Sequence, residues 1–281
     1  MKSILVIGAT GNIGRQVISQ LIDTDAHISA LTRNPDKAQL PAKVEVVQGD
    51  LTTPETLDKC LAGIQTVFMV WTLPPANFTP VLERIARRAK RIVLLSAPIK
   101  TAHPFFQQPN PARDMYSQLE KQIETSGLEW IFLRPGMFAG NALHWWAQQI
   151  RTGNIVRWPY LNAPTAPIDE RDLAAVAVRA LCEEGHAEKE YVLTGPQSLT
   201  QYEQISIIGN VIGRSLQIEE MAADEAKQVW QNSPGGNMLL NAWAAALGQP
   251  AFVTTTVEEV TGKSARTFLD WATDHAKEFR T

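Results

Sequence analysis

The feature that most constrains this chain is a turn with three spaced glycines close to its N-terminus. Ser3–Ile7 is rich in apolar and β-branched residues, which favour a strand. Gly8-Ala9-Thr10-Gly11-Asn12-Ile13-Gly14 follows directly, and apolar residues then recur at helical spacing, at Ile13, Val17, Ile18 and Leu21. A strand that passes through closely spaced glycines into a helix opens a βαβ unit, so the chain is predicted to be an α/β protein.

Each glycine of this turn has its own physical reason. Gly8 permits the tight turn off the strand, Gly11 lets the backbone approach a pyrophosphate, and Gly14 lets the helix pack closely on the sheet. The first N–H groups of a helix have no partner inside it, and the helix dipole makes this end partly positive. We therefore expect a dinucleotide site made by Gly8, Thr10, Gly11, Asn12, Ile13 and Gly14; the alternative is a turn that merely needs glycine.

Short apolar runs alternate with helical periodicity through the first half of the chain. The runs are His27–Leu31, Val44–Val47, Thr66–Val70, Ile92–Leu95 and Trp130–Leu133. They lack polar alternation, as expected of parallel strands that are covered by helices on both faces. The pattern predicts a doubly wound parallel sheet of the Rossmann type.

The second half has a different pattern, and it predicts a smaller, mostly helical cap. Thr200 and Glu203 form a capping box before an apolar helix, and Gly213 suits the end of that helix. The segment Gly153–Pro167 is rich in Pro, Gly and Asn and is predicted to be loop. We expect a dinucleotide domain over residues 1–135, completed by segments near 169–195, and a substrate-binding cap over 136–281 that is interleaved with the sheet.

The residue after the second strand indicates which cofactor binds. An NAD site usually has a carboxylate there for the ribose hydroxyl, whereas NADP sites commonly use arginine for the 2′-phosphate. This chain has Thr32-Arg33-Asn34, so Arg33 favours NADP(H). Asp50, after the third strand, could accept from the adenine amino group; the alternative is a cap for the helix that follows.

Composition excludes several other classes of protein. The 281 residues carry a formal net charge of −3 and no long basic run, which argues against a nucleic-acid or membrane partner. Only Cys60 and Cys182 are present, far apart, so neither a disulfide framework nor a metal site is expected. No apolar run is long enough for a membrane span. These observations favour a cytoplasmic protein, and they leave monomer and homodimer open.

Several motifs together resemble the NmrA-like, atypical short-chain dehydrogenase/reductase family. They are the glycine turn, Arg33, Gly49-Asp50-Leu51, Leu94-Leu95-Ser96-Ala97 and Leu133-Arg134-Pro135-Gly136. Segments of the second half resemble its ergot-alkaloid dehydrogenase branch, among them Leu193-Thr194-Gly195-Pro196-Gln197 and Val260-Thr261-Gly262-Lys263. The resemblance implies an extended Rossmann fold that binds NADP(H). Leu51, Trp71 and Ser96 follow the third, fourth and fifth strands, where ligands of such sheets bind, and are predicted to lie near the cofactor. The resemblance also implies relatives that reduce iminium ions, quinones or triphenylmethane dyes, and others that only sense NADP.

The catalytic pair of most short-chain dehydrogenases is broken here. Those enzymes use Tyr-x-x-x-Lys, in which lysine lowers the tyrosine pKa. Tyr116 is the candidate, but Glu120 stands four residues later, and Lys121 would point away from Tyr116 on a helix. Tyr116 also shares a helical face with Leu119 and Ile123, so the alternative is a core residue. Ser96 is predicted to contact the cofactor, without a catalytic role being assigned to it.

Aromatic side chains after the sixth strand suggest a pocket for a flat ligand. The predicted lining residues are Met137, Phe138, Trp145, Trp146 and Tyr160. Such rings could also hold a cation. The alternative for each of them is a place in the core of the cap.

These observations predict an NADPH-dependent reductase of an electrophilic, conjugated small molecule. Reducing a carbonyl gives an alkoxide that needs a proton, whereas reducing an iminium needs none and reducing a quinone gives a stabilised phenolate. Loss of the Tyr/Lys pair therefore favours iminium, quinone or related acceptors. The alternatives are a non-catalytic NADP(H) sensor of the NmrA-like kind and a redox-neutral biosynthetic enzyme; a sugar-nucleotide epimerase or dehydratase would need the missing pair.

Overall fold

The computed structural model describes residues 2–231, 233 and 235–280. The chain divides into two compact units, each made of segments that are far apart in sequence. Unit 1 comprises Met1–Ile99, Pro111–Pro135 and Glu170–Val192. Unit 2 comprises Lys100–Asn110, Gly136–Asp169 and Leu193–Thr281.

A seven-stranded sheet forms the centre of unit 1, in the order β3-β2-β1-β4-β5-β6-β9. The strands are β1 (Ser3–Ile7), β2 (His27–Thr32), β3 (Glu45–Gln48), β4 (Thr66–Val70), β5 (Arg91–Leu95), β6 (Glu129–Pro135) and β9 (Lys189–Leu193). The first six are parallel by register. Backbone bonds from Glu188 to Trp130 and from Gly136 to Leu193 run along β6 and β9 in the same direction, so β9 is parallel too. The doubly wound sheet predicted from sequence is confirmed.

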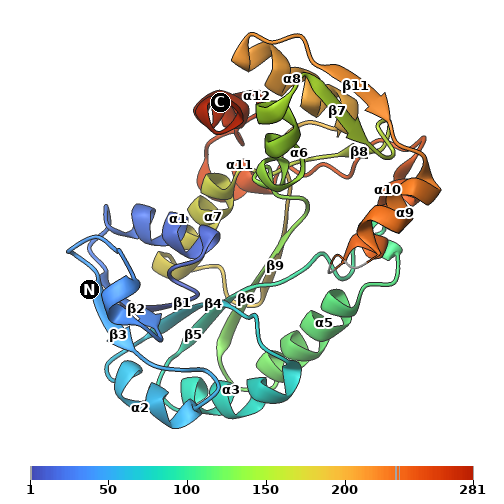
Figure 1. The fold of residues 1–281 in the computed structure, drawn as a ribbon. Helices are drawn as coiled ribbons and strands as arrows, with labels where there is room; N and C mark the ends of the chain where they lie inside the picture. The colour runs from blue at the N-terminus through green and yellow to red at the C-terminus, as the bar shows by residue number, and fades with distance from the viewer. Residues whose placement is uncertain (1, 232, 234, 281) are drawn as a thin grey trace. The chain divides into compact units, whose positions relative to one another are not determined.

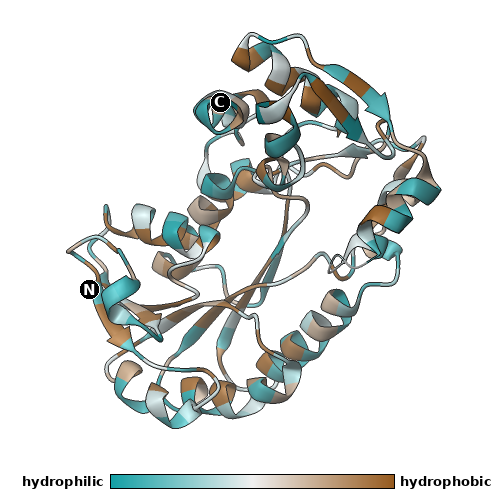
Figure 2. Cartoon of the chain, viewed as in Figure 1, coloured by the Kyte–Doolittle hydropathy of each residue, from teal (hydrophilic) through white to brown (hydrophobic). Residues whose placement is uncertain are grey.

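Helices cover both faces of this sheet (Figure 1). The helices α1 (Asn12–Leu21) and α7 (Glu170–Cys182) pack together on one face, and α2 (Leu57–Cys60), α3 (Phe78–Ala86) and α5 (Pro111–Glu124) lie on the other. Since both faces are covered, the inner strands β1 and β4 are mainly apolar, and hydrophobic stretches are seen within the sheet in Figure 2. In β5, all five residues are buried.

The strand order places a topological switch point between β1 and β4. From β1 the chain winds outward to β2 and β3, and it then returns to β4 on the other side of β1. In open α/β sheets, ligands bind outside the carboxyl ends of the strands at such a point. The glycine turn follows β1 at that end of the sheet.

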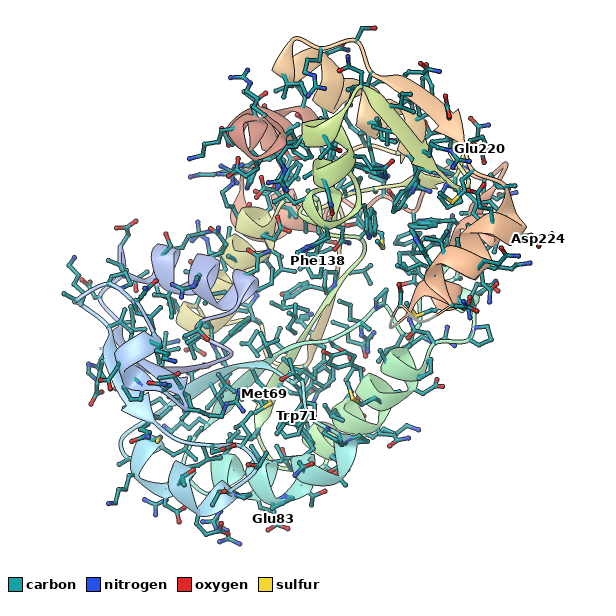
Figure 3. All side chains as sticks on the ribbon, in the orientation of Figure 1. Met69, Trp71, Glu83, Phe138, Glu220 and Asp224 are labelled. Atoms are coloured by element: carbon teal, nitrogen blue, oxygen red, sulfur yellow. The ribbon has the colours of Figure 1, made fainter. Side chains whose placement is uncertain are left out.

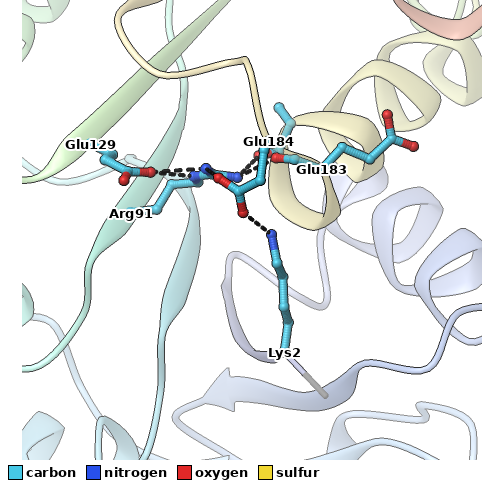
Figure 4. A network of polar contacts seen from close by, with 6 residues as sticks. Lys2, Arg91, Glu129, Glu183 and Glu184 are labelled. Atoms are coloured by element: carbon cyan, nitrogen blue, oxygen red, sulfur yellow. Dashed lines mark hydrogen bonds and ion pairs between the residues drawn. The ribbon is translucent and has the colours of Figure 1, made fainter.

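At the opposite, amino end of the sheet, Arg91 joins three elements (Figure 4). This arginine begins β5, and its guanidinium is bonded to Glu129 at the start of β6 and to Glu184. It also donates to the carbonyl oxygens of Ala180 and Glu183, which satisfies the last turn of α7. Arg91 therefore supplies hydrogen-bond donors to carbonyl groups at the C-terminal end of α7.

Unit 2 is mostly helical, as predicted, with two small sheets. Its helices are α4 (Pro104–Gln107), α6 (Asn141–Thr152), α8 (Gln201–Ile212), α9 (Ala223–Trp230), α10 (Gly236–Ala246), α11 (Thr256–Thr261) and α12 (Phe268–Asp274). The capping box of Thr200 and Glu203 is present, and Gly213 ends α8 with φ of 71°. None of the helices in the described residues has the length and apolar character needed to cross a bilayer.

The prediction that Gly153–Pro167 is loop was wrong in part. The segment contains β7 (Ile155–Trp158), which pairs in parallel with β11 (Gln217–Glu220), and β8 (Pro164–Thr165), which pairs with β10 (Leu199–Thr200). Burial alternates along β7, with Val156 and Trp158 inside. The prediction failed because Pro, Gly and Asn residues surround these short strands, and because the strands with which they pair, β10 and β11, lie far away in sequence.

Tryptophan side chains fill much of the core of unit 2. Trp145, Trp146, Trp158, Trp230 and Trp243 pack edge-to-face or tilted, with ring centroids 4.8 to 5.8 Å apart. Trp146 and Trp243 are fully buried, whereas Trp145 and Trp230 are half-buried. The indole N–H of Trp158 donates to Gln201 at 2.6 Å, which fixes that ring.

Candidate functional site

The glycine turn is too crowded for side chains at two of its three glycines. Gly8 has φ of +86°, and a Cβ there would meet Val70 Cβ at 2.8 Å. A Cβ on Gly14 would lie 2.1 Å from the carbonyl oxygen of Gly8. A Cβ on Gly11 meets only that oxygen, at 3.3 Å, and otherwise points into open space. Gly8 and Gly14 are therefore required by the fold, whereas Gly11 keeps a space clear.

The N-terminus of α1 fits a diphosphate. Its N-cap residue is Gly11, which offers no side chain to cap the helix. The backbone N–H of Gly11 donates to Gly8 at 3.0 Å, and this bond closes the turn. The next N–H groups, from Asn12 onward, open the helix in front of a backbone that carries no Cβ at residue 11. This is the cradle that a pyrophosphate needs.

Two side chains that sequence reasoning did not identify brace this turn. Arg15 donates to the carbonyl oxygen of Thr10 at 3.0 Å and to those of Gln39 and Ala38. Glu170, the first residue of α7, accepts from the side-chain amide of Asn12 at 3.4 Å. Only the helical position of Arg15, one turn into α1, could have drawn attention to it, since its partners are backbone atoms.

Arg33 and Asp50 lie close together beyond the ends of β2 and β3. Arg33 is exposed and directly follows β2. Asp50 accepts from the backbone N–H of Thr52 at 2.9 Å and from its hydroxyl at 2.8 Å. These bonds, with a smaller contribution from the charge of Arg33, lower the pKa of Asp50. Asp50 thus organises its own turn, while the contact with adenine stays a prediction; Leu51 packs partly buried on the core of unit 1.

Trp71 belongs to the core of unit 1, and Tyr116 packs half-buried against that core. The ring of Trp71 is 1% exposed and packs edge-to-face on Phe78 at 4.9 Å, which corrects the expectation that this indole faces the cofactor. Figure 3 shows Trp71 beyond Met69, just after β4. The hydroxyl of Tyr116 donates to the carbonyl oxygen of Trp71 at 3.1 Å. Burial raises the pKa of Tyr116, which is opposite to the activation of a catalytic tyrosine.

The position where the family pattern has lysine holds a buried ion pair instead. Glu120 is 4% exposed, and its two oxygens accept from the guanidinium of Arg134 at 3.0 and 2.5 Å. Arg134 also binds Glu190. Burial would lower the pKa of Arg134, but the two carboxylates outweigh it and raise the pKa. The position of the missing lysine is therefore occupied by Glu120, whose charge balances the buried guanidinium of Arg134.

Ser96 is part of this network. It follows β5 at the carboxyl end of the sheet and is 6% exposed. Its hydroxyl donates to Glu120 Oε1 at 2.6 Å, and its backbone N–H donates to Leu133 at 2.7 Å. Its only hydroxyl proton is thereby turned toward the core.

The residues predicted for the substrate pocket lie at four different places in unit 2. Met137 lines a small cavity, Trp145 lines a larger groove, and Trp146 lies fully inside the tryptophan core, so its predicted place in a pocket was wrong. Phe138 forms a bridge to Ile168 and is half-buried. Tyr160 packs partly buried on the same core with φ of 52°.

The small cavity begins where β6 ends. It is lined by His103, Phe105, Phe106, Gly136, Met137, Pro164, Thr165, Ala166, Thr194, Ala251 and Phe252. Both ring nitrogens of His103 are engaged: Nδ1 accepts from Phe105 at 3.2 Å, and Nε2 lies 2.9 Å from the carbonyl oxygen of Pro250. His103 is the one titratable side chain among these lining residues, so the cavity in the described structure presents no free acid.

The larger groove has a volume of about 530 Å³. Trp145, Trp158 and Trp230 form an aromatic wall, and His144, Gln148 and Thr152 project from successive turns of α6. Arg157 at its edge is paired with Glu225 at 3.0 Å and with Glu219 at 3.7 Å.

Comparison with known proteins agrees with the geometry of the turn. Residues 8–184 match the model of the NAD(P)H-binding family. The chain is 35% identical to (4-alkanoyl-5-oxo-2,5-dihydrofuran-3-yl)methyl phosphate reductase of Streptomyces griseus, covering 98% of this chain and 99% of that protein. It is 34% identical to NAD(P)H azoreductase of Xenophilus azovorans, with the same coverage of each chain.

Solved structures share the fold at lower identity. NADPH-dependent quinone oxidoreductase from Escherichia coli superposes with a TM-score of 0.80 at 22% identity, covering 96% of this chain and 98% of that one. Triphenylmethane reductase from Citrobacter sp., solved with NADP(H), gives 0.81 at 22% identity, covering 98% and 99%.

Proposed function

This chain belongs to the NAD(P)H-binding family and is an oxidoreductase of it, and from that premise we propose that it uses NADPH to reduce a conjugated, electrophilic small molecule. The observation that carries the proposal is the glycine turn at the switch point of the sheet, with a space kept clear at Gly11. Full-length likeness to two reductases, one of azo compounds by name, supports reduction of a conjugated acceptor.

Four sets of residues would hold the cofactor. The backbone of Gly8 to Gly14 takes the diphosphate, and Arg33 takes the 2′-phosphate, because a guanidinium matches a phosphate with two parallel hydrogen bonds. Asp50 and Leu51 lie where the adenosine half would rest, and Ser96 lies at the carboxyl end of β5. Bound NADPH would supply the hydride.

The acceptor class is inferred from two candidate acids in the described residues, neither of which is free. The hydroxyl of the half-buried Tyr116 donates to the carbonyl oxygen of Trp71, and both nitrogens of His103 are engaged. We propose that the acceptor binds over Met137, beside the phenylalanine-lined cavity that follows β6; this cavity has a volume of about 10 Å³ and could take only a small substituent of the acceptor. The acceptors that need no protein acid are quinones and, from the resemblance to ergot-alkaloid dehydrogenases, iminium ions; azo compounds are added to the panel because of the likeness to the azoreductase.

The test is oxidation of NADPH, followed by its absorbance, with a panel of quinone, azo and iminium acceptors and with simple ketones as controls. We expect turnover with the first three groups and none with the ketones. Met137→Trp, which puts a bulky indole at the proposed acceptor position, should abolish turnover while calorimetric binding of NADP⁺ is kept. Binding of NADP⁺ without turnover of any acceptor would favour a cofactor sensor instead.

A further inference from the structure

We propose that Ser96 is a hydrogen-bond acceptor for the carboxamide N–H of the nicotinamide, held in that role by Glu120. The inference rests on the proposed function, since it assigns a specificity-determining contact within the same site. It reverses the role expected of a serine at the end of β5, which would be to donate a proton.

The first step is the direction of the serine hydroxyl. Ser96 Oγ lies 2.6 Å from Glu120 Oε1, and both side chains are buried. Glu120 accepts from Arg134 on both of its oxygens, and arginine has no acceptor atom. A proton on this carboxyl group would face these donors, so Glu120 is a carboxylate and Ser96 is the donor.

The second step concerns the hydrogen bonds that the Ser96 hydroxyl can still make. A serine hydroxyl has one proton and two lone pairs. The proton is committed to Glu120, and no donor from the described residues is hydrogen-bonded to Ser96 Oγ. Its lone pairs can therefore only accept.

The third step is the place of this acceptor. Ser96 follows β5, two strands from β1 on the β4 side of the switch point, whereas Arg33 follows β2 on the other side. A dinucleotide that spans the carboxyl ends of the strands, with its 2′-phosphate at Arg33, brings its nicotinamide half to the side of Ser96. The carboxamide carries the only N–H groups of the nicotinamide.

Glu120 is thus a positioning residue, which acts through Ser96. It is fixed by Arg134, and Arg134 is itself held by Glu190 on β9. Ser96 after β5 and Arg134 near the end of β6 thus converge on one carboxylate, so the serine cannot rotate its proton toward a ligand without leaving that buried charge less satisfied.

The experiment compares calorimetric binding of NADP⁺ with that of its acetylpyridine analogue, in which a methyl group replaces the amide NH₂. We expect the wild-type protein to prefer NADP⁺ by about three- to tenfold, the range that one neutral hydrogen bond contributes. Ser96→Ala should remove this preference, and Ser96→Thr should restore it. Ser29→Ala is the matched control. Ser29, on β2, is also buried and donates to the carboxylate of Glu45 at 2.9 Å. The Ser29→Ala protein should keep the preference for NADP⁺ over the analogue.

Glu120→Gln tests the positioning role, because it leaves the hydroxyl of Ser96 in place but replaces one of the two acceptor oxygens at residue 120 by an NH₂ donor, so the direction of the serine proton is no longer fixed. We expect the preference of this variant for NADP⁺ over the acetylpyridine analogue to fall, although residue 96 is unchanged. If Glu120→Gln does not fold, the binding preference of Ser96→Ala tests the proposal. Equal affinity of wild-type protein for both nucleotides, or an undiminished preference in Ser96→Ala, would overturn the inference alone. Wild-type protein that binds neither nucleotide would overturn the proposed function as well.

Discussion

Adding one methyl group to the glycine turn should separate cofactor binding from folding, depending on which glycine receives it. At Gly11 the backbone has φ of −79° and ψ of 172°, which alanine adopts freely, and the new Cβ meets only Gly8 O at 3.3 Å. Alanine is a poorer N-cap by about 0.5–1 kcal/mol, and a similar gain arises from the less flexible unfolded chain. Gly11→Ala should therefore melt within about 2 °C of the wild-type protein.

The same variant should bind NADP⁺ weakly. Its methyl group fills the space in front of the first N–H groups of α1 and keeps the diphosphate away from them. A hydrogen bond to a charged group contributes about 1.5–3 kcal/mol, so loss of one such bond lowers affinity by about ten- to a hundredfold. Calorimetric titration with NADP⁺ measures this loss.

Gly14→Ala should instead act mainly on folding and lower the melting temperature of the protein. The new Cβ would lie 2.1 Å from Gly8 O, 2.8 Å from Gly8 C and 2.9 Å from Ala9 Cα, all backbone atoms that cannot rotate away. Overpacking of this kind costs about 1–3 kcal/mol, or roughly 3–10 °C in melting temperature. Circular dichroism melts without cofactor would show it. A Gly11→Ala protein that melts as early as Gly14→Ala, or that binds NADP⁺ as tightly as the wild type, would refute the reasoning.

Three further substitutions test other parts of the site. Arg33→Gln should weaken NADP⁺ binding about tenfold or more and leave NAD⁺ affinity unchanged, as measured by titration with each nucleotide; equal losses for both would contradict a phosphate contact. Tyr116→Phe should change the NADPH turnover rate less than about twofold between pH 6 and 9, because the hydroxyl of Tyr116 donates to the carbonyl oxygen of Trp71, and a tenfold loss would restore it as a catalytic acid. Glu120→Gln should lower the free energy of unfolding by about 3–5 kcal/mol in urea titrations, since it leaves the buried Arg134 less balanced, and a loss below 1 kcal/mol would mean that the pair is dispensable.

The elements of unit 1 could be predicted because their signals are local. Ser3–Ile7 and Thr66–Val70 were predicted with the bounds that the structure has, since each is a buried apolar run that ends at a turn. Gly8 and Gly14 could likewise be assigned structural roles, because the strand–turn–helix context fixes which backbone atoms surround them.

Contacts over long sequence distances could not be predicted in this way. β7 and β11 pair across some sixty residues, and nothing in either short segment names its partner. The same is true of Glu120: its spacing from Tyr116 showed that a lysine was missing, but only the fold shows that Arg134 and Ser96 converge on it. Trp71 and Trp146 illustrate a third limit, because an aromatic residue beside a predicted site has the same sequence signal whether it faces the ligand or the core.

The Glu120–Arg134 pair has a consequence for attempts to convert this scaffold into an alcohol dehydrogenase. Restoring the Tyr-x-x-x-Lys pattern takes one codon at position 120, yet it would set an ammonium group against a guanidinium that is 2% exposed. Two cations cannot share that interior, so Arg134 would have to be exchanged at the same time, and Glu190 with it. The two chemistries are therefore separated by a coordinated set of substitutions, and a directed-evolution campaign limited to single changes would pass through intermediates that bury an unbalanced charge.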